Sequence, residues 1–117
     1  MKEVDDNKIT IFIDVDDTLT NNCGKTFITD SIETIKDLSN KANIFIWSQG
    51  GIEYVKDIVK QARIESFICG MLPKPDIIID DMPIKTKWIR KHLWPVWDMI
   101  KEWSNLLTGN WADDFDI

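Results

Sequence analysis

Apolar runs and helically periodic segments alternate along the first two thirds of the chain. The β-branched and aromatic run at 9–14 (ITIFID) predicts a buried strand, and the run at 43–47 (NIFIW) predicts a second one. Shorter apolar runs at 66–69 (SFIC) and 76–80 (DIIID) predict two further strands. Strands that alternate with helices indicate an α/β fold, in which helices cover both faces of a parallel sheet.

Two helices are predicted between these strands. Residues 31–43 have apolar positions at spacings of three and four, and Asp30 with Glu33 forms a box-like N-terminal cap. A second helix is predicted after Gly50 and Gly51, because the residues that follow place apolar side chains on one face. That face consists of Ile52, Val55, Ile58, Val59 and Ala62.

The last third of the chain has the pattern of further helices within 84–109. Pro95 separates two of them, and Gly109 is expected to end the second. Five of the six tryptophans fall between Trp88 and Trp111, and the tail 110–117 is acidic. Because no linker is long enough to join a second domain, we expect one domain over 1–117.

Composition limits the class of protein. Hydrophobic residues make up 44% and charged residues 29%, which is typical of a soluble globular chain. No apolar run approaches the roughly 20 residues that cross a bilayer, and the acidic start does not resemble a signal peptide, so a cytoplasmic protein is expected. Cys23 and Cys69 are expected to be reduced thiols. The net charge of -6 argues against general duplex binding, but it allows a single phosphorylated substrate.

Carboxylates gather at the ends of two predicted strands. Asp14 ends the first strand, Asp16 and Asp17 follow in the turn, and Asp80 with Asp81 ends the run at 76–80. The carboxyl ends of parallel strands are where α/β sheets bind ligands. Grouped carboxylates repel one another unless a cation is present, and oxygen ligands favour Mg2+. The alternative is ordinary turn chemistry, in which aspartates cap the following segment.

Ser48 and Lys74 provide groups that could hold an anion. Ser48 ends the second predicted strand, directly before Gly50, Gly51 and the start of a helix. A hydroxyl, open backbone N–H groups and a helix N-terminus together favour anion binding. Lys74 lies between two prolines, which limit the freedom of the backbone. Taken alone, a serine or a lysine of this kind is more often an ordinary surface residue.

In this order the motifs resemble those of the haloacid dehalogenase-like (HAD) superfamily of phosphohydrolases. They are the strand end from Asp14 to Thr18 (DVDDT), then Ser48, then Lys74, then the acidic pair at 80–81. The ordered set extends over 9–83, about two thirds of the chain. The resemblance implies a Rossmann-like three-layer sandwich with a mostly parallel sheet of strand order 3-2-1-4.

The resemblance also implies roles for individual residues. Asp14 would be the nucleophile that becomes an aspartyl phosphate, and Asp16 would be the general acid and then the base that activates water. Mg2+ would be held by Asp14, the backbone carbonyl of Asp16, and Asp80. Ser48 and Lys74 would hold the phosphoryl oxygens, and Lys74 would also orient Asp14.

The resemblance further implies that Asp81 lies in the outer coordination sphere or binds the metal through water. We expect the pKa of Asp16 to be raised by the neighbouring acids, because the first step needs it protonated. The implied activity is Mg2+-dependent hydrolysis of phosphomonoesters.

Many members of that superfamily carry an inserted cap domain, for which this chain has no room. Only residues 19–47 separate Thr18 from Ser48, and only 25 residues separate Ser48 from Lys74. The loop 20–27 (TNNCGKTF) is expected to be a short flap, with Asn22 and Lys25 exposed to solvent and Cys23 a passive thiol.

A site without a cap is open to solvent, so the sequence does not decide the size of the substrate. The site could accept a phosphoprotein or a nucleic-acid end, or a neighbouring subunit could close it around a small molecule. The Trp-rich segment 84–109 could complete the core through Trp88 and Trp103, mediate self-association, or reach substrate. His92 is expected to be a packed or surface residue.

Two rival functions remain from the sequence. A nucleotide or nucleic-acid-end phosphatase would use the basic residues of the segment, although a solvated helix face with snorkelling lysines is the favoured explanation of them. These residues are Lys85, Lys87, Arg90 and Lys91. The other rival is a non-catalytic binding module that uses the Trp-rich surface.

Overall fold

The computed structural model describes residues 1–77, 79 and 81. The chain divides into two units, Met1–Pro75 and Asp76–Ile117, and every helix and strand described here lies in the first. In this part of the chain, no helix combines the length and the apolar character needed to span a membrane. The predictions for Asp80, His92, the segment 84–109 and the tail 110–117 lie outside the described residues.

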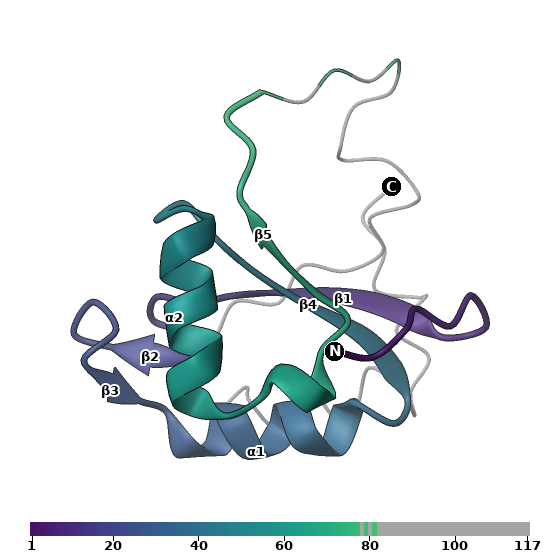
Figure 1. Ribbon diagram of the computed structural model, residues 1–117, viewed down its shortest axis with the longest axis horizontal. Coiled ribbons are helices and arrows are strands. Elements are labelled where there is room, and N and C mark those ends of the chain that lie inside the picture. Colours follow the sequence, from purple (N-terminus) through teal and green to yellow (C-terminus); the bar gives the residue numbers. More distant parts are fainter. Residues whose placement is uncertain (78, 80, 82–117) are drawn as a thin grey trace, which may run out of the picture. The chain divides into compact units, whose positions relative to one another are not determined.

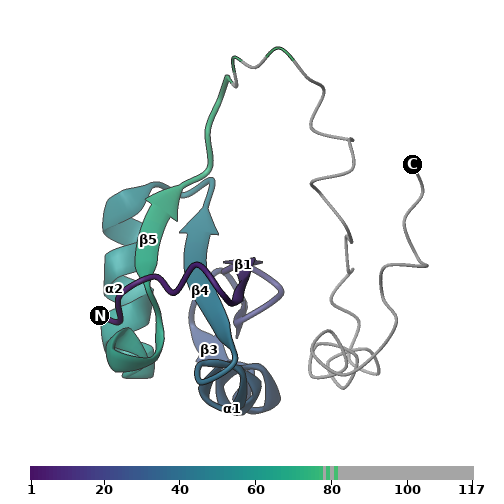
Figure 2. The ribbon, with the colours of Figure 1, turned by 90° about the vertical axis from the view of Figure 1, so that its right-hand side faces the viewer.

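A parallel three-stranded sheet forms the centre of the first unit. It consists of β1 (Ile9–Asp14), β4 (Ala42–Ser48) and β5 (Gly70–Pro73), with β4 between the other two. Ile46 of β4 pairs with Ile13 on one side and with Met71 on the other. Figure 2 shows β4 and β5 side by side with their arrowheads at the same end. The predicted α/β class and the strands at 9–14 and 43–47 are confirmed.

The strand order differs from the predicted 3-2-1-4. Over the described residues the order is β1-β4-β5, and no strand lies beyond β1. Of the predicted fourth strand at 76–80, the described Asp76, Ile77 and Ile79 belong to no strand, and both isoleucines are largely exposed. The N–H of Lys74 still donates to the carbonyl of Ser48, but Pro75, which follows, has no N–H to donate, so the described pairing with β4 does not continue into this run.

The third strand occupies different residues from those predicted. The run 66–69 is not a strand, because Glu65–Phe67 forms one turn of 3-10 helix and β5 begins only at Gly70. Ile68 is fully buried, and the N–H of Cys69 donates to the carbonyl of Ile44 at 2.7 Å. The apolar run therefore marked a buried connection that leads into the strand.

The first helix is shorter than predicted. α1 (Thr29–Leu38) starts two residues before the predicted start at 31 and ends five residues before the predicted end at 43. It cannot extend to 43, because Ala42 pairs with Ile9 in the sheet. The capping box of Asp30 and Glu33 does not form; Ile28 is the N-cap, and Asp30 lies in the first turn, where a carboxylate favours the positive helix end. The second helix, α2 (Ile52–Ala62), is confirmed.

One face of the sheet packs against the helices. Ile13, Ile44 and Ile46 are buried on that face, and α1 and α2 both pack on β4. The helices contribute the buried side chains Ile32, Ile35, Leu38, Val55, Ile58 and Val59. Burial of each such side chain contributes roughly 1.5–3 kcal/mol to folding.

The opposite face of the sheet is aromatic. Phe12 is 45% exposed, and its ring centroid lies 5.2 Å from that of Phe45 and 5.0 Å from that of Trp47. Leu72 of β5 is also exposed. Since successive strand residues point to opposite faces, these side chains lie on the face away from Ile13 and Ile46.

The predicted flap is a small hairpin between β1 and α1. β2 (Thr20–Asn21) pairs in an antiparallel manner with β3 (Thr26–Phe27), and Figure 1 shows the hairpin beside α2. Asn22, Cys23 and Gly24 all have positive φ in the turn. The side chains of Asn22 and Lys25 are exposed, as expected, and Cys23 is an exposed free thiol.

Candidate active site

A tight turn follows β1 and presents Asp16 to solvent. The carbonyl of Val15 accepts the N–H groups of Thr18, Leu19 and Thr20 at 3.2, 2.8 and 3.1 Å. Val15 and Leu19 are fully buried, whereas Asp16 between β1 and this turn is exposed. The buried side chains of Val15 and Leu19 anchor the turn in the core, so the DVDDT segment has a defined conformation at the carboxyl end of β1.

Asp14 at the end of β1 forms an ion pair with Lys74. The Nζ atom of Lys74 lies 3.1 Å from Oδ1 of Asp14, and the two side chains are 28% and 34% exposed. The charges come from the two outer strands of the described sheet, because Lys74 follows β5 directly. The pair therefore lies across the carboxyl edge of the sheet.

Backbone and ring contacts explain how Lys74 reaches Asp14. Its N–H donates to the carbonyl of Ser48 at 2.9 Å, which extends the pairing of β5 with β4 by one residue beyond Pro73. Its Nζ atom also lies 5.6 Å from the ring centroid of Trp47, the residue that pairs with Asp14. The ammonium thus lies over the aromatic face of the sheet, where cation–π attraction adds to the ion pair.

Ser48 ends β4 with its side chain on the helix side of the sheet. The residue is 1% exposed, and its Oγ accepts the N–H of Gly50 at 3.0 Å. Its carbonyl accepts from Gly51 at 3.4 Å, and α2 begins at the next residue. The hydroxyl therefore shapes the turn that leads into the N-terminus of α2.

Asp16 is held by a residue that the sequence analysis did not single out. The phenol of Tyr54, in the first turn of α2, donates to Oδ1 of Asp16 at 2.5 Å. Partial burial, and then the Asp16 carboxylate, raise the pKa of Tyr54 from 10.0 to about 12; a hydrogen bond with Thr20 acts in the opposite direction. The phenol therefore stays protonated across the physiological range.

The flap packs directly on Tyr54. A Cβ atom added at Gly24, in the hairpin turn, would lie 2.6 Å from the phenol oxygen. Gly24 has a φ of +87°, so a side chain there would also be strained. The turn after β1, the hairpin and the first turn of α2 thus meet at one phenol group.

The predicted site residues fall into two contact groups at the carboxyl end of the sheet. Asp14 contacts Lys74, and Asp16 contacts Tyr54. Among the described residues, no hydrogen bond joins the Asp14–Lys74 pair to the Asp16 carboxylate or to the Ser48 hydroxyl. The predicted metal ligand Asp80 lies outside the described residues, and within them no three acidic, histidine or cysteine side chains form a metal-binding group.

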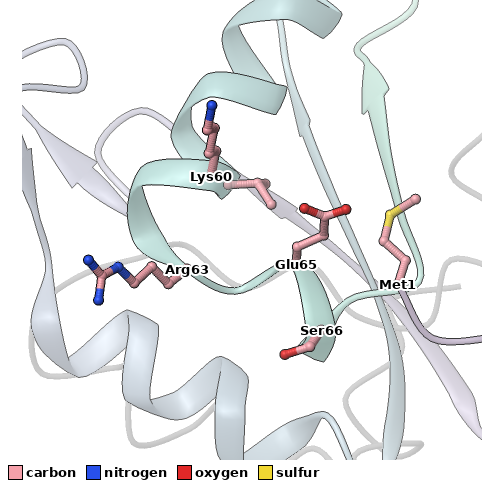
Figure 3. Close-up of a pocket in the computed structure, with 6 residues that line it drawn as sticks. Met1, Lys60, Arg63, Glu65 and Ser66 are labelled. Atoms are coloured by element: carbon pink, nitrogen blue, oxygen red, sulfur yellow. The ribbon is translucent and has the colours of Figure 1, made fainter.

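A pocket lies elsewhere, at the C-terminal end of α2. Its volume is about 410 Å3, and Figure 3 shows side chains that line it. The lining residues are Met1, Val59, Lys60, Arg63, Glu65 and Ser66. Because α2 begins at the carboxyl edge of the sheet and ends at the opposite edge, this pocket is remote from Asp14 and Lys74.

One signal in the sequence could have identified Tyr54. It is the single tyrosine of the chain, and it lies three residues after a Gly-Gly turn and four before Ile58, at the border of the apolar face. A tyrosine at such a border has a hydroxyl that needs a polar partner. Comparison of the chain with protein-family models, with curated proteins and with solved structures found no match.

Proposed function

We propose that the protein is a Mg2+-dependent phosphomonoesterase that acts through Asp14. The observation that carries the proposal is the ion pair between Lys74 and Asp14 at the carboxyl edge of a parallel sheet. A lysine at this place neutralises charge on a transferring phosphoryl group and holds a nucleophilic carboxylate in position. The turn that presents Asp16 provides the second carboxylate that hydrolysis needs.

The oxygen donors at this edge suit a hard cation. The carboxylate of Asp14 and the backbone carbonyl of Asp16 would hold Mg2+, together with Asp80 by the sequence prediction. The ion, when bound, neutralises negative charge on the phosphoryl oxygens and so lets one anion approach another. Two of the three proposed ligand residues, Asp14 and Asp16, are described: Asp14 ends β1, and Asp16 follows in the turn.

The proposed reaction has two steps at the phosphorus atom. In the first, a carboxylate oxygen of Asp14 forms a bond to phosphorus, the ester P–O bond breaks, and Asp16 gives its proton to the departing oxygen. In the second, Asp16 takes a proton from water, the resulting hydroxide attacks phosphorus, and inorganic phosphate leaves Asp14. Lys74 and the N–H groups at the start of α2 would hold the other phosphoryl oxygens, and the buried Ser48 would position that turn through its hydrogen bond with Gly50.

We further propose that the aromatic face of the sheet is covered by the chain's own segment 84–109, giving the three-layer Rossmann-like arrangement. Phe12, Phe45 and Trp47 form an apolar surface of the kind that is usually covered in a soluble domain. By the sequence prediction, the segment would supply apolar helical faces that include Trp88 and Trp103.

A panel of phosphate esters tests the activity. Release of inorganic phosphate would be measured with Mg2+, with and without chelator, over sugar phosphates, nucleotides, oligonucleotide ends and an aryl phosphate. We expect release that requires the metal, and the preferred member of the panel would identify the substrate class. No release across the panel would contradict the proposal and favour the non-catalytic binding module.

A further inference from the structure

We propose that Tyr54 is the positioning residue for Asp16 in phosphoryl transfer, an inference that rests on the proposed function. The phenol of Tyr54 donates to one carboxylate oxygen, Oδ1, at 2.5 Å. The second oxygen of Asp16 is then the one that faces the leaving group of the substrate. The side chain of Asp16 is exposed, and a carboxylate there without such a contact would sample several rotamers.

The surroundings of Tyr54 restrict the position of its phenol. Its ring lies so close to Gly50 that a Cβ atom there would be 2.6 Å from Cδ2, and the phenol oxygen is equally close to the Cβ position of Gly24. The ring is therefore confined between the turn after β4 and the tip of the hairpin. A confined donor can fix the rotamer of an exposed acceptor, whereas two mobile side chains would gain little from their contact.

The chemistry of the step explains why a donor is useful here. As Asp16 gives its proton to the departing oxygen, its carboxyl group becomes a carboxylate. A hydrogen bond from a neutral phenol is stronger to a carboxylate than to a carboxylic acid. The contact with Tyr54 therefore strengthens as the proton moves, which stabilises the transition state more than the ground state.

This role predicts a dependence on the leaving group. Departure of an alkoxide needs the proton, whereas para-nitrophenolate leaves readily without it. Tyr54→Phe retains the ring and removes the donor, so we expect kcat for an alkyl phosphate to fall about tenfold or more, with KM unchanged. For para-nitrophenyl phosphate kcat should change less than about threefold. An equal loss for both substrates would indicate a general structural defect and overturn the inference.

A control and a double variant complete the test. Gln61→Leu removes a different exposed hydrogen bond from α2, that of Gln61 to Asp57 at 2.8 Å, and should leave both rates unchanged. In an Asp16→Asn background, Tyr54→Phe should cause no further loss of kcat. If Tyr54→Phe lowered kcat in the Asp16→Asn background as much as it does in the wild type, Tyr54 would not act through Asp16.

A readout independent of activity distinguishes this inference from the proposed function. The equilibrium constants of unfolding for Tyr54→Phe, Asp16→Asn and the double variant should be non-additive by about three- to tenfold, because the two side chains are in contact. Additive values would overturn the inference while leaving the phosphatase proposal intact. Inactive wild-type protein with non-additive values would overturn both the reaction and the role of Tyr54 in it, and would leave the contact as a structural one.

Discussion

The ammonium of Lys74 lies 3.1 Å from the carboxylate of Asp14, although Asp14 ends β1 and Lys74 directly follows β5, the two outer strands of the described sheet. The ion pair crosses β4 over the ring of Trp47. It joins the first and third of the four motifs that suggested a phosphohydrolase from the sequence.

Asp14→Asn should reduce phosphate release to background. An amide oxygen is a poor nucleophile and cannot form the acyl phosphate that the proposed reaction needs. Release of inorganic phosphate from the best substrate of the panel measures the effect. The matched control is Asp37→Asn, because Asp37 is an exposed acid on α1; it should keep full activity. Undiminished release by Asp14→Asn would rule out Asp14 as the nucleophile.

Lys74→Met should separate activity from stability. The ion pair is about one third exposed, and pairs of this kind contribute about 1 kcal/mol or less to the free energy of unfolding. Loss of a positive charge at a transferring phosphoryl group costs about a hundredfold in kcat. Urea unfolding and phosphate release measure the two quantities.

Lys56→Met is the control for Lys74→Met. Lys56 lies 3.7 Å from Glu53 on the exposed side of α2, so its loss removes an ion pair that involves neither Asp14 nor Asp16. Neither stability nor activity should change appreciably. If Lys74→Met retained wild-type kcat, Lys74 would have only a structural role.

The raised pKa of Tyr54 predicts a loss of stability in alkali. The folded protein holds the phenol proton up to about pH 12, whereas the unfolded chain releases it near 10.0. Below the unfolded-state pKa of 10.0 the phenol therefore contributes its full stabilisation to the folded protein. This contribution is lost as the pH rises from that value to the folded-state pKa of about 12. The difference in unfolding free energy between wild type and Tyr54→Phe should shrink over that window. Parallel pH curves for the two proteins would contradict the shift.

Gly24→Ala and Gly51→Ala form a matched pair for the packing of the flap on Tyr54. Both glycines have positive φ, of +87° and +95°, so each alanine carries a backbone penalty of about 1–2 kcal/mol. The new Cβ atom at Gly24 would meet the phenol of Tyr54, whereas a Cβ atom at Gly51 would have no atom within 4 Å. Urea unfolding should show the larger loss for Gly24→Ala. Equal losses would mean that the flap does not pack on Tyr54.

Phe12→Asp tests whether the aromatic face of the sheet is covered. If the segment 84–109 packs there, a buried charge should lower the free energy of unfolding by about 2 kcal/mol or more. Val4→Asp places the same charge at an apolar residue outside the sheet and should change stability by less than about 0.5 kcal/mol. Similar small effects for both would leave the face open to solvent. A stability that depends on protein concentration would instead favour a second copy of the chain as the cover.

Much of the described fold could be predicted, because its central elements have strong patterns. The strands at 9–14 and 43–47 and the helix after Gly51 are continuous apolar runs or regular apolar faces, and local patterns of this strength agree with the final packing. The boundaries that failed depend on pairing between distant residues. Ala42 fits the apolar face of a helix equally well, and only its partner Ile9 assigns it to the sheet.

The candidate site shows the same division between local and distant information. Asp14, Ser48 and Lys74 could be located from their places at strand ends, since the order of strands and turns implies a common edge. The contact of Tyr54 with Asp16 could not be predicted from the sequence. It depends on how α2 packs against a hairpin whose strands have two residues each. No periodicity in the sequence records that packing.

The position of the ion pair also has a consequence for folding. Asp14 and Lys74 can meet only when β1 and β5 have both paired with β4 in the right order, so their contact reports that the whole described sheet has assembled. A chain with a misplaced outer strand keeps its local turns but cannot bring these two charges together. The contact therefore depends on the correct order of all three strands, and it can form only once both long-range pairings are in place.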